Sequence, residues 1–228
     1  MKKILSVLII MSLMVMSLGS IAMADSSSIV VHDVESTPVN TNVIYKFIDP
    51  SLKTDPIALE KFPSLMMSSV ASEQYLYSYY KIRDHRIVGY NSLPTYNQKH
   101  IISIAKGQTV STTRTVSTSG SVSFESSPST EIKGLINSSF GISGSVTYEV
   151  TNGTTFSFPS EWTAYNSADF YLGVSADKHK FTLDKVDVYQ VSVGNYGFTL
   201  EHRTDSNGSK TQYAHKPKKV VYSKPGSH

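Results

Sequence analysis

A strict alternation of side-chain type in the middle of the chain constrains the fold more than any other feature. Every odd-numbered residue from Ser111 to Ser123 is Ser or Thr, whereas the even-numbered residues from Val110 to Phe124 include three valines and a phenylalanine. Successive side chains of a β-strand point to opposite faces of its sheet. The segment therefore predicts an amphipathic strand with one hydroxyl-bearing face and one largely apolar face.

A second segment, from Ser139 to Thr151, repeats this alternation in the same phase. Residues 119–125 read SGSVSFE and residues 143–149 read SGSVTYE, so the two segments carry nearly the same heptapeptide. Antiparallel pairing with Phe124 near Ser138 gives partners whose numbers add to an even total, which brings both apolar rows to one face. The residues expected on this face are Val110, Val116, Val122, Phe124, Phe140, Ile142, Val146 and Tyr148.

The connector between the two segments, residues 125–137, is expected to form the tip of this hairpin. It contains Ile132, Leu135 and Ile136, which would make the leading end apolar. Arms of about 15 residues would extend for about 50 Å, well beyond the usual strand of about 5–6 residues, and such a hairpin needs a long partner. The Asn152-Gly153 dipeptide is a strong hairpin signal and predicts a further turn.

The first 24 residues have the layout of a secretory signal peptide. Lys2 and Lys3 precede an apolar run that ends in Ala22-Met23-Ala24, a small-x-small pattern that signal peptidases accept. We expect cleavage after Ala24 and secretion from a bacterium. Cleavage removes two of the 21 Lys and Arg residues and leaves 19 against 18 Asp and Glu, so a nucleic-acid partner is not expected.

Composition divides the remaining chain into an N-terminal α+β region, residues 25–106, and a β-rich region, residues 107–228, with the hairpin at 110–150. Helical spacing predicts two short helices at about 56–61 and 64–73. Short β-branched and aromatic runs predict strands at 30–31, 43–47, 81–90, 100–105, 170–175, 179–183, 186–193 and 196–203. The expected fold is mainly β: elongated antiparallel sheets or a β-sandwich with a long Ser/Thr-rich amphipathic hairpin and a small N-terminal helical insertion.

No residue pattern in the chain predicts catalysis, a metal site or a cofactor. Cysteine is absent, which excludes a disulfide scaffold, a thiolate metal site and a cysteine nucleophile. None of the seven histidines forms an HExxH or HxH pattern, and nucleophile-elbow and phosphate-loop motifs are missing. Asp184 and Asp187 lie three residues apart on a predicted strand, so their carboxylates would point to opposite faces. We therefore expect a non-enzymatic protein.

Aromatic residues give the sequence its candidates for a binding surface. Four tyrosines lie close together before residue 81, and the single tryptophan lies far along the chain. Such rings stack on sugars or lie at a membrane interface, although ordinary core packing explains them equally well. The candidate surface residues are Tyr75, Tyr77, Tyr79, Tyr80 and Trp162.

The two Ser/Thr-rich alternating segments around a partly apolar connector resemble the insertion region of the aerolysin-like β-pore-forming toxin family. The resemblance implies a secreted protein that forms a homo-oligomer, binds a membrane or cell-surface receptor and inserts its hairpins into the membrane. A spanning strand needs about 9–11 residues, which each arm supplies. Arg114 departs from the pattern, because it places a charge in the row that would face lipid.

A second interpretation places the same residues in a β-sandwich that binds a cell-surface glycan or a protein partner. A sandwich strand also has one apolar and one hydroxyl-rich face. The two interpretations differ in the length of the arms. A sandwich is expected to bend or bulge them near Gly120 and Gly144, whereas a membrane hairpin favours unbroken arms.

Overall fold

The computed structural model describes residues 29–52, 73–192, 197–205 and 207–226. The predicted signal peptide and nearly all of the predicted helical insertion lie outside these ranges.

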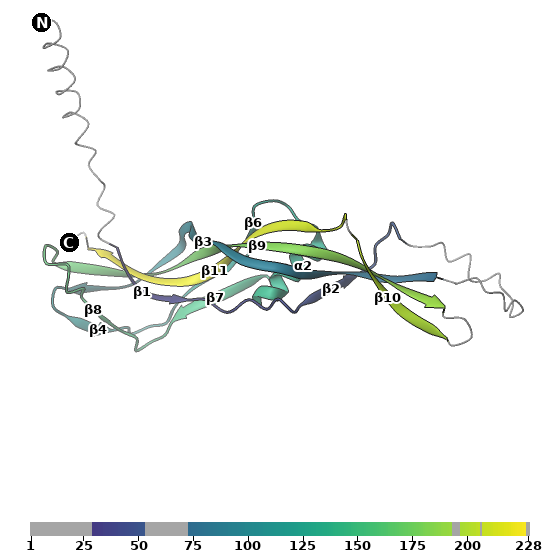
Figure 1. Ribbon diagram of the computed structural model, residues 1–228. Helices are drawn as coiled ribbons and strands as arrows, with labels where there is room; N and C mark the ends of the chain where they lie inside the picture. The colour runs from purple at the N-terminus through teal and green to yellow at the C-terminus, as the bar shows by residue number, and fades with distance from the viewer. Residues whose placement is uncertain (1–28, 53–72, 193–196, 206, 227–228) are drawn as a thin grey trace, which may run out of the picture.

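The molecule is elongated and mainly β, as the sequence predicts (Figure 1). Its frame consists of three long antiparallel strands: β3 (Glu73–Ala105), β9 (Ser167–Ser192) and β11 (Lys210–Pro225). β9 lies between the other two, and its 26 residues extend for about 85 Å at roughly 3.3 Å per residue. β3 comes from the N-terminal region and β9 from the β-rich region, so both regions build one sheet.

Four shorter strands complete this sheet, one of which is β6 (Ser123–Phe124), paired with β11. β1 (Val30–Glu35) pairs with β11, β2 (Ile44–Phe47) pairs with β3, and β10 (Phe198–Thr204) pairs with the last part of β9. Where the sequence predicts separate short strands at 170–175, 179–183 and 186–193, the structure has β9 alone. Its polar residues do not end the strand, because they are paired inside the sheet: the Lys218 ammonium lies 2.6 Å from the Asp177 carboxylate, and both side chains are buried.

The strand β3 is longer than the part of β9 that it faces. Its residues 89–99 lie opposite residues 172–178 of β9, with several shifts of register. Asn91 and Asn97 have left-handed φ values of 49° and 51° in this segment, a conformation that Asn tolerates better than most residues. The extra residues therefore bulge out of the sheet, and Asn97 reaches the hairpin described below.

The Ser/Thr-rich region forms a second layer on the long sheet. Its elements are β4 (Thr109–Ser111), β5 (Val116–Ser121), β6 (Ser123–Phe124), α2 (Thr130–Phe140), β7 (Ser145–Val150) and β8 (Thr155–Ser157). β5 pairs with β7 and β4 with β8, each as a two-stranded sheet, while β6 adds to the edge of β11. We call β4, β5, β7 and β8 with their connections, residues 109–121 and 145–157, the hairpin layer.

The segment that the sequence predicts as the hairpin tip holds the helix α2 in this structure. Ile132, Leu135 and Ile136 have the spacing of one helical face, and Glu131 lies in the first turn, where it favours the helix dipole. Gly141 ends the helix with a φ of 69°, and its N–H donates to the Ser138 carbonyl. Helices are predicted from the sequence only before residue 107, so α2 is a helix that was not predicted.

The hairpin layer and α2 cover opposite faces of β9. Phe170, Leu172 and Val174, all even-numbered, lie against the hairpin layer, whereas Phe181 and Leu183 pack with α2. β9 pairs with β11 without a bulge over this length, so its side chains keep alternating between the faces. Long strands twist along their length. The Ser/Thr-rich region can therefore form one continuous layer that contacts one face of β9 through the hairpin layer and the other face through α2.

Candidate functional site

The two ladders of the hairpin layer share one register. Val116 pairs with Val150 in β5–β7 and Thr109 pairs with Ser157 in β4–β8, so paired numbers add to 266 in both. The total is even, as the sequence predicts. It is four higher than the total for a pairing of Phe124 with Ser138, so the observed register differs from the predicted one by four residues. The gap between the ladders therefore changes the shape of the hairpin without changing which residues face each other.

The gap between the two ladders, residues 112–115 and 151–154, contains the polar residues Thr112 and Arg114 of the otherwise apolar row. Arg114 would lie opposite Asn152 and is exposed to solvent, because burying its guanidinium against the long sheet would be costly. Thr112 is buried and donates from Oγ1 to the Thr151 carbonyl at 3.0 Å, and its own carbonyl accepts from the Gly153 N–H at 2.9 Å. A turn does form at Asn152-Gly153, as predicted, where the Thr154 N–H donates to the Thr151 carbonyl at 3.2 Å. It does not make a hairpin, because β7 and β8 both run antiparallel to the same arm.

Neither arm is an unbroken strand. β5 ends at Ser121, directly after Gly120, and β7 begins at Ser145, directly after Gly144. The arms are thus interrupted close to the two glycines as well as at the polar gap, which is the behaviour expected of a sandwich.

The hydroxyl face of the hairpin layer is exposed and the apolar face lies on the long sheet. Hydroxyls pair across the strands, with Thr109 Oγ1 2.8 Å from Ser157 Oγ. Val116, Val150 and Phe156 are buried in a core cluster with residues of β9. Of the residues predicted for the apolar face, Val116, Phe140 and Ile142 are buried, and Val110, Val122, Phe124, Val146 and Tyr148 are half-buried.

Hydrogen bonds also join the hairpin layer to the frame, beside its apolar contacts with β9. Thr118 donates from Oγ1 to the Asn97 carbonyl at 2.7 Å, and Asn97 donates from Nδ2 to the Ser119 carbonyl at 2.8 Å. Tyr148 donates from its hydroxyl to the Pro217 carbonyl at 2.7 Å, and burial raises the pKa of Tyr148 to about 12. These bonds join the hairpin to the bulged part of β3 and to β11.

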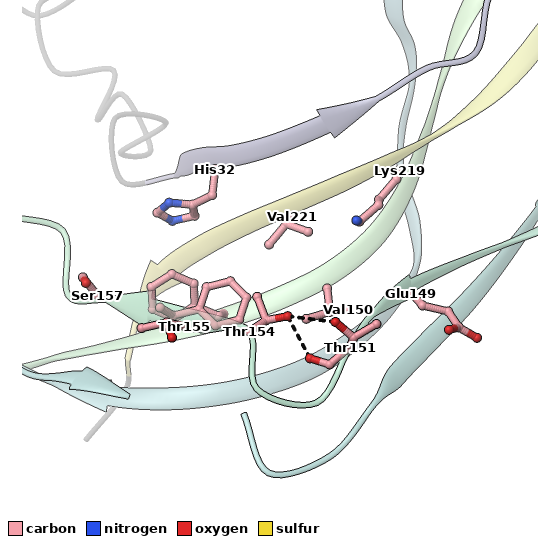
Figure 2. A pocket seen from close by; sticks show the side chains of 11 residues that line it. His32, Glu149, Val150, Thr151, Thr154, Thr155, Ser157, Lys219 and Val221 are labelled. Carbon is pink, nitrogen blue, oxygen red and sulfur yellow. Dashed lines mark hydrogen bonds between the residues drawn. The ribbon is translucent and has the colours of Figure 1, made fainter. Parts of the chain in front are cut away.

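A cavity of about 480 Å³ separates one edge of the hairpin layer from the frame (Figure 2). Thr151 and Thr154 line it from the gap, and His32 and Lys219 line it from β1 and β11. His32 Nε2 lies 2.8 Å from Ser223 Oγ, and burial lowers the pKa of this imidazole. A second cavity of about 390 Å³ lies beside Tyr148 and α2, so the hairpin layer is incompletely packed along this edge.

The helix α2, in contrast, lies on a close-packed bed. Leu135 and Ile136 have no exposed surface and Phe140 has 2%, and all three pack with Phe181 and Leu183 of β9. Ile132 is 3% exposed. The residues predicted as a leading apolar tip are therefore core residues in this state.

A group of cationic and imidazole side chains lies under the last turn of α2. The Phe140 ring is 5.0 Å from the His179 ring and 5.4 Å from the Lys216 ammonium, which donates to the Thr37 carbonyl. His179 Nδ1 lies 2.8 Å from His85 Nε2. Burial, together with the neighbouring His85 and Lys216, lowers the pKa of His179 to about 4. No sequence motif announces this group, because its members come from three distant strands.

The aromatic candidates from the sequence do not form one surface. Tyr75 and Tyr80 are buried in the sheet, where Tyr80 stacks on Phe47, and Trp162 is a core residue at 4% exposure. Tyr77 and Tyr79 are half-buried on β3.

Other classes of site are not found in the part of the chain that the structure describes. No three His, Asp or Glu side chains there are grouped to hold a metal ion, and no helix there has the length and apolarity needed to cross a membrane. Comparison of the chain with family models, curated proteins and solved structures finds no match.

Proposed function

We propose that this protein is a secreted, non-enzymatic pore-forming protein whose hairpin leaves the long sheet and enters a membrane as part of a homo-oligomer. The single register of the hairpin layer carries the proposal. Because both ladders have the same pairing, the two arms can straighten into one amphipathic hairpin without exchanging partners.

Extending this register toward α2 gives a membrane span of suitable length. Residues 116–126 would face residues 140–150, eleven on each arm, where a tilted spanning strand needs about 9–11. Phe124 would then lie opposite Ile142 in the apolar row. Arg114 falls outside this span, near the interface, where a charge costs only about 0–1 kcal/mol.

The contacts that hold the hairpin layer also suit detachment. Hydrogen bonds from Thr118, Asn97 and Tyr148 can be replaced by bonds to water, so breaking them costs little net free energy. The cavities beside the arm mean that part of its apolar row lacks close-packed neighbours.

The interrupted arms favour a second function, a β-sandwich that binds a cell-surface glycan or a protein partner. In that case the cavity near His32 and Lys219 is the candidate binding place, with apolar walls from Phe156 and Phe170. The hairpin would then stay on the frame throughout.

A disulfide that locks the hairpin distinguishes the two functions. A Cβ at Gly120 would lie 2.8 Å from Val174 Cγ1, close to the spacing of Cβ and the partner Sγ in a disulfide. The pair Gly120→Cys and Val174→Cys can form only this bond, because the chain has no other cysteine. Both the chain from Asp25 and the full-length chain are tested.

Dye release from liposomes is measured before and after reduction. We expect no release by the oxidised protein, and release by the reduced protein and by each single cysteine variant. Release by the fully oxidised protein would mean that the hairpin does not need to detach. No release in any state, from neutral, anionic or cell-derived lipid, would favour the sandwich that binds a surface.

A further inference from the structure

The sheet end formed by β2, β3, β9 and β10 has one face that carries exposed side chains along its two outer strands. Lys46 and Tyr77 meet on this face, with the ammonium 4.8 Å from the ring centroid, and Tyr79 meets His202, with ring centroids 6.0 Å apart. Val188 pairs with both Tyr77 and His202 and so fixes their common side. We call this the distal face; it consists of Ile44, Lys46, Tyr77, Tyr79, Lys81, Phe198, Leu200 and His202.

Large apolar side chains are unusually exposed on the distal face. Phe198 is 67% exposed, Leu200 55% and Ile44 48%. Phe198, Leu200 and His202 alternate along β10, so they share one side of the strand. Single exposed apolar residues are ordinary, but a group of them beside half-buried tyrosines indicates an interaction surface.

The charges of this end are divided between its two faces. Glu73 and Glu201 lie on the opposite face, where both bind Arg203, with nearest N–O distances of 2.6 Å. Asp187, also on that face, lies 3.2 Å from the Lys185 ammonium.

The distal face itself carries Lys46, Lys81 and His202. Two carboxylates of these four strands, as far as the structure describes them, lie on its side: Asp84, which is exposed opposite Thr182 and outside the distal face, and Asp184. The Asp184 side chain is only 8% exposed and lies 3.2 Å from Arg83. The eight residues of the distal face therefore include two lysines and a histidine and no carboxylate.

We propose that the distal face docks on an anionic lipid surface. Tyrosine rings favour the membrane–water interface, Phe198 and Leu200 would enter the boundary of the acyl chains, and the two lysines would approach the lipid phosphates. The inference deepens the proposed function, on which it rests, by naming the surface that reaches the membrane before the hairpin moves.

Binding is measured by co-sedimentation with vesicles of phosphatidylcholine, with and without phosphatidylserine. We expect binding only to the anionic vesicles. Lys46→Gln with Lys81→Gln should weaken it about 30-fold, since each lysine near an anionic surface contributes about fivefold. Lys99→Gln with Lys133→Gln removes the same charge from exposed positions elsewhere and should weaken it much less.

A second pair tests the apolar residues. Phe198→Ser with Leu200→Ser should abolish sedimentation, whereas Val31→Ser with Val34→Ser, at similarly exposed positions of β1, should not. Circular dichroism of each variant confirms that it is folded.

Docking and pore formation fail in different ways. The oxidised Gly120→Cys and Val174→Cys protein cannot release its hairpin, so its sedimentation reports docking alone. Its binding to anionic vesicles, lost in the distal-face variants, supports the inference even if no dye is ever released. Equal binding to neutral vesicles, no binding, or unchanged binding by both pairs of distal-face variants would overturn it.

Discussion

The hairpin layer and α2 cover the same long sheet, but they are held on it in different ways. Leu135 and Ile136 of α2 are fully buried against apolar residues of β9. The hairpin layer packs Val116, Val150 and Phe156 on β9 and is joined to the frame by a few hydrogen bonds, but it has cavities of about 480 and 390 Å³ along one edge. In this structure, therefore, α2 is packed more closely on the long sheet than the hairpin layer is, and in the proposed conversion the helix would control when the hairpin leaves.

The largest difference is expected from shortening one core side chain in each region. Leu135→Ala should lower the free energy of unfolding by about 2–5 kcal/mol, because a fully buried leucine leaves a cavity. Val150→Ala removes two methyl groups beside an existing cavity and should cost only about 1–2 kcal/mol. Urea unfolding gives both values. A larger loss for the hairpin variant would reverse the comparison.

Two glycines, one in α2 and one in the hairpin layer, lie so close to neighbouring side chains that an added Cβ would clash. A Cβ at Gly134 of α2 would lie 2.3 Å from Tyr45 Cε2, so Gly134→Ala should cost about 1–3 kcal/mol. Gly120→Ala meets Val174 and Pro217 at 2.8 and 2.9 Å and should cost less. In urea unfolding, the combination Gly134→Ala with Tyr45→Ala should lose less than the two single losses added together. Strict additivity would show that the ring does not oppose the new methyl group.

Acid should weaken the packing of α2 on the long sheet. The pKa of His179 is about 4 in this structure and about 6.5 when the imidazole is solvated, so protonation favours a state in which α2 has left the sheet and His179 is exposed to water. The stabilisation is complete above about pH 6.5 and is lost as the pH falls toward 4. His85, Lys216 and His215 oppose the new charge, and Asp177 alone favours it.

We expect a loss of about 1–2 kcal/mol between pH 7 and pH 5. Hydrogen exchange of the α2 amides, corrected for intrinsic rates, measures it. His179→Gln should remove most of the pH dependence while leaving exchange at pH 7 similar. The same acid response in wild type and variant would assign the effect to other groups.

The smallest effect is expected from one hydrogen bond between the hairpin and the frame. Tyr148→Phe removes the donor to the Pro217 carbonyl and should lower the free energy of unfolding by about 0.5–1.5 kcal/mol. If pore formation requires detachment, this variant should also release dye faster than wild type. Slower release would mean that the hydroxyl acts after the hairpin has left the sheet.

The sequence predicted best the features that follow from backbone periodicity. The alternation from Val110 to Phe124 gave the exposed hydroxyl face and the even-numbered pairing, because a period of two is a property of the strand itself. It could not give the helix as directly, since Ile132, Leu135 and Ile136 were interpreted as a connector between two strands. The length of β9 was hidden by Asp177 and other buried charges, whose partners lie on a distant strand.

The grouping under α2 was equally out of reach of the sequence. His85, His179 and Lys216 are far apart in the chain and become neighbours only through the pairing of β9 with both β3 and β11. Conversely, Trp162, the single tryptophan, was predicted as a candidate surface residue and is a core residue in the structure.

The common register of the two ladders has a kinetic consequence. Bringing two distant segments of a chain together costs loop-closure entropy, and here that cost has been met before any membrane is encountered. No search among alternative pairings is then required at the bilayer. In the proposed conversion the slow step is the first-order detachment of α2 from β9. Its rate in an assembled complex should therefore not depend on protein concentration.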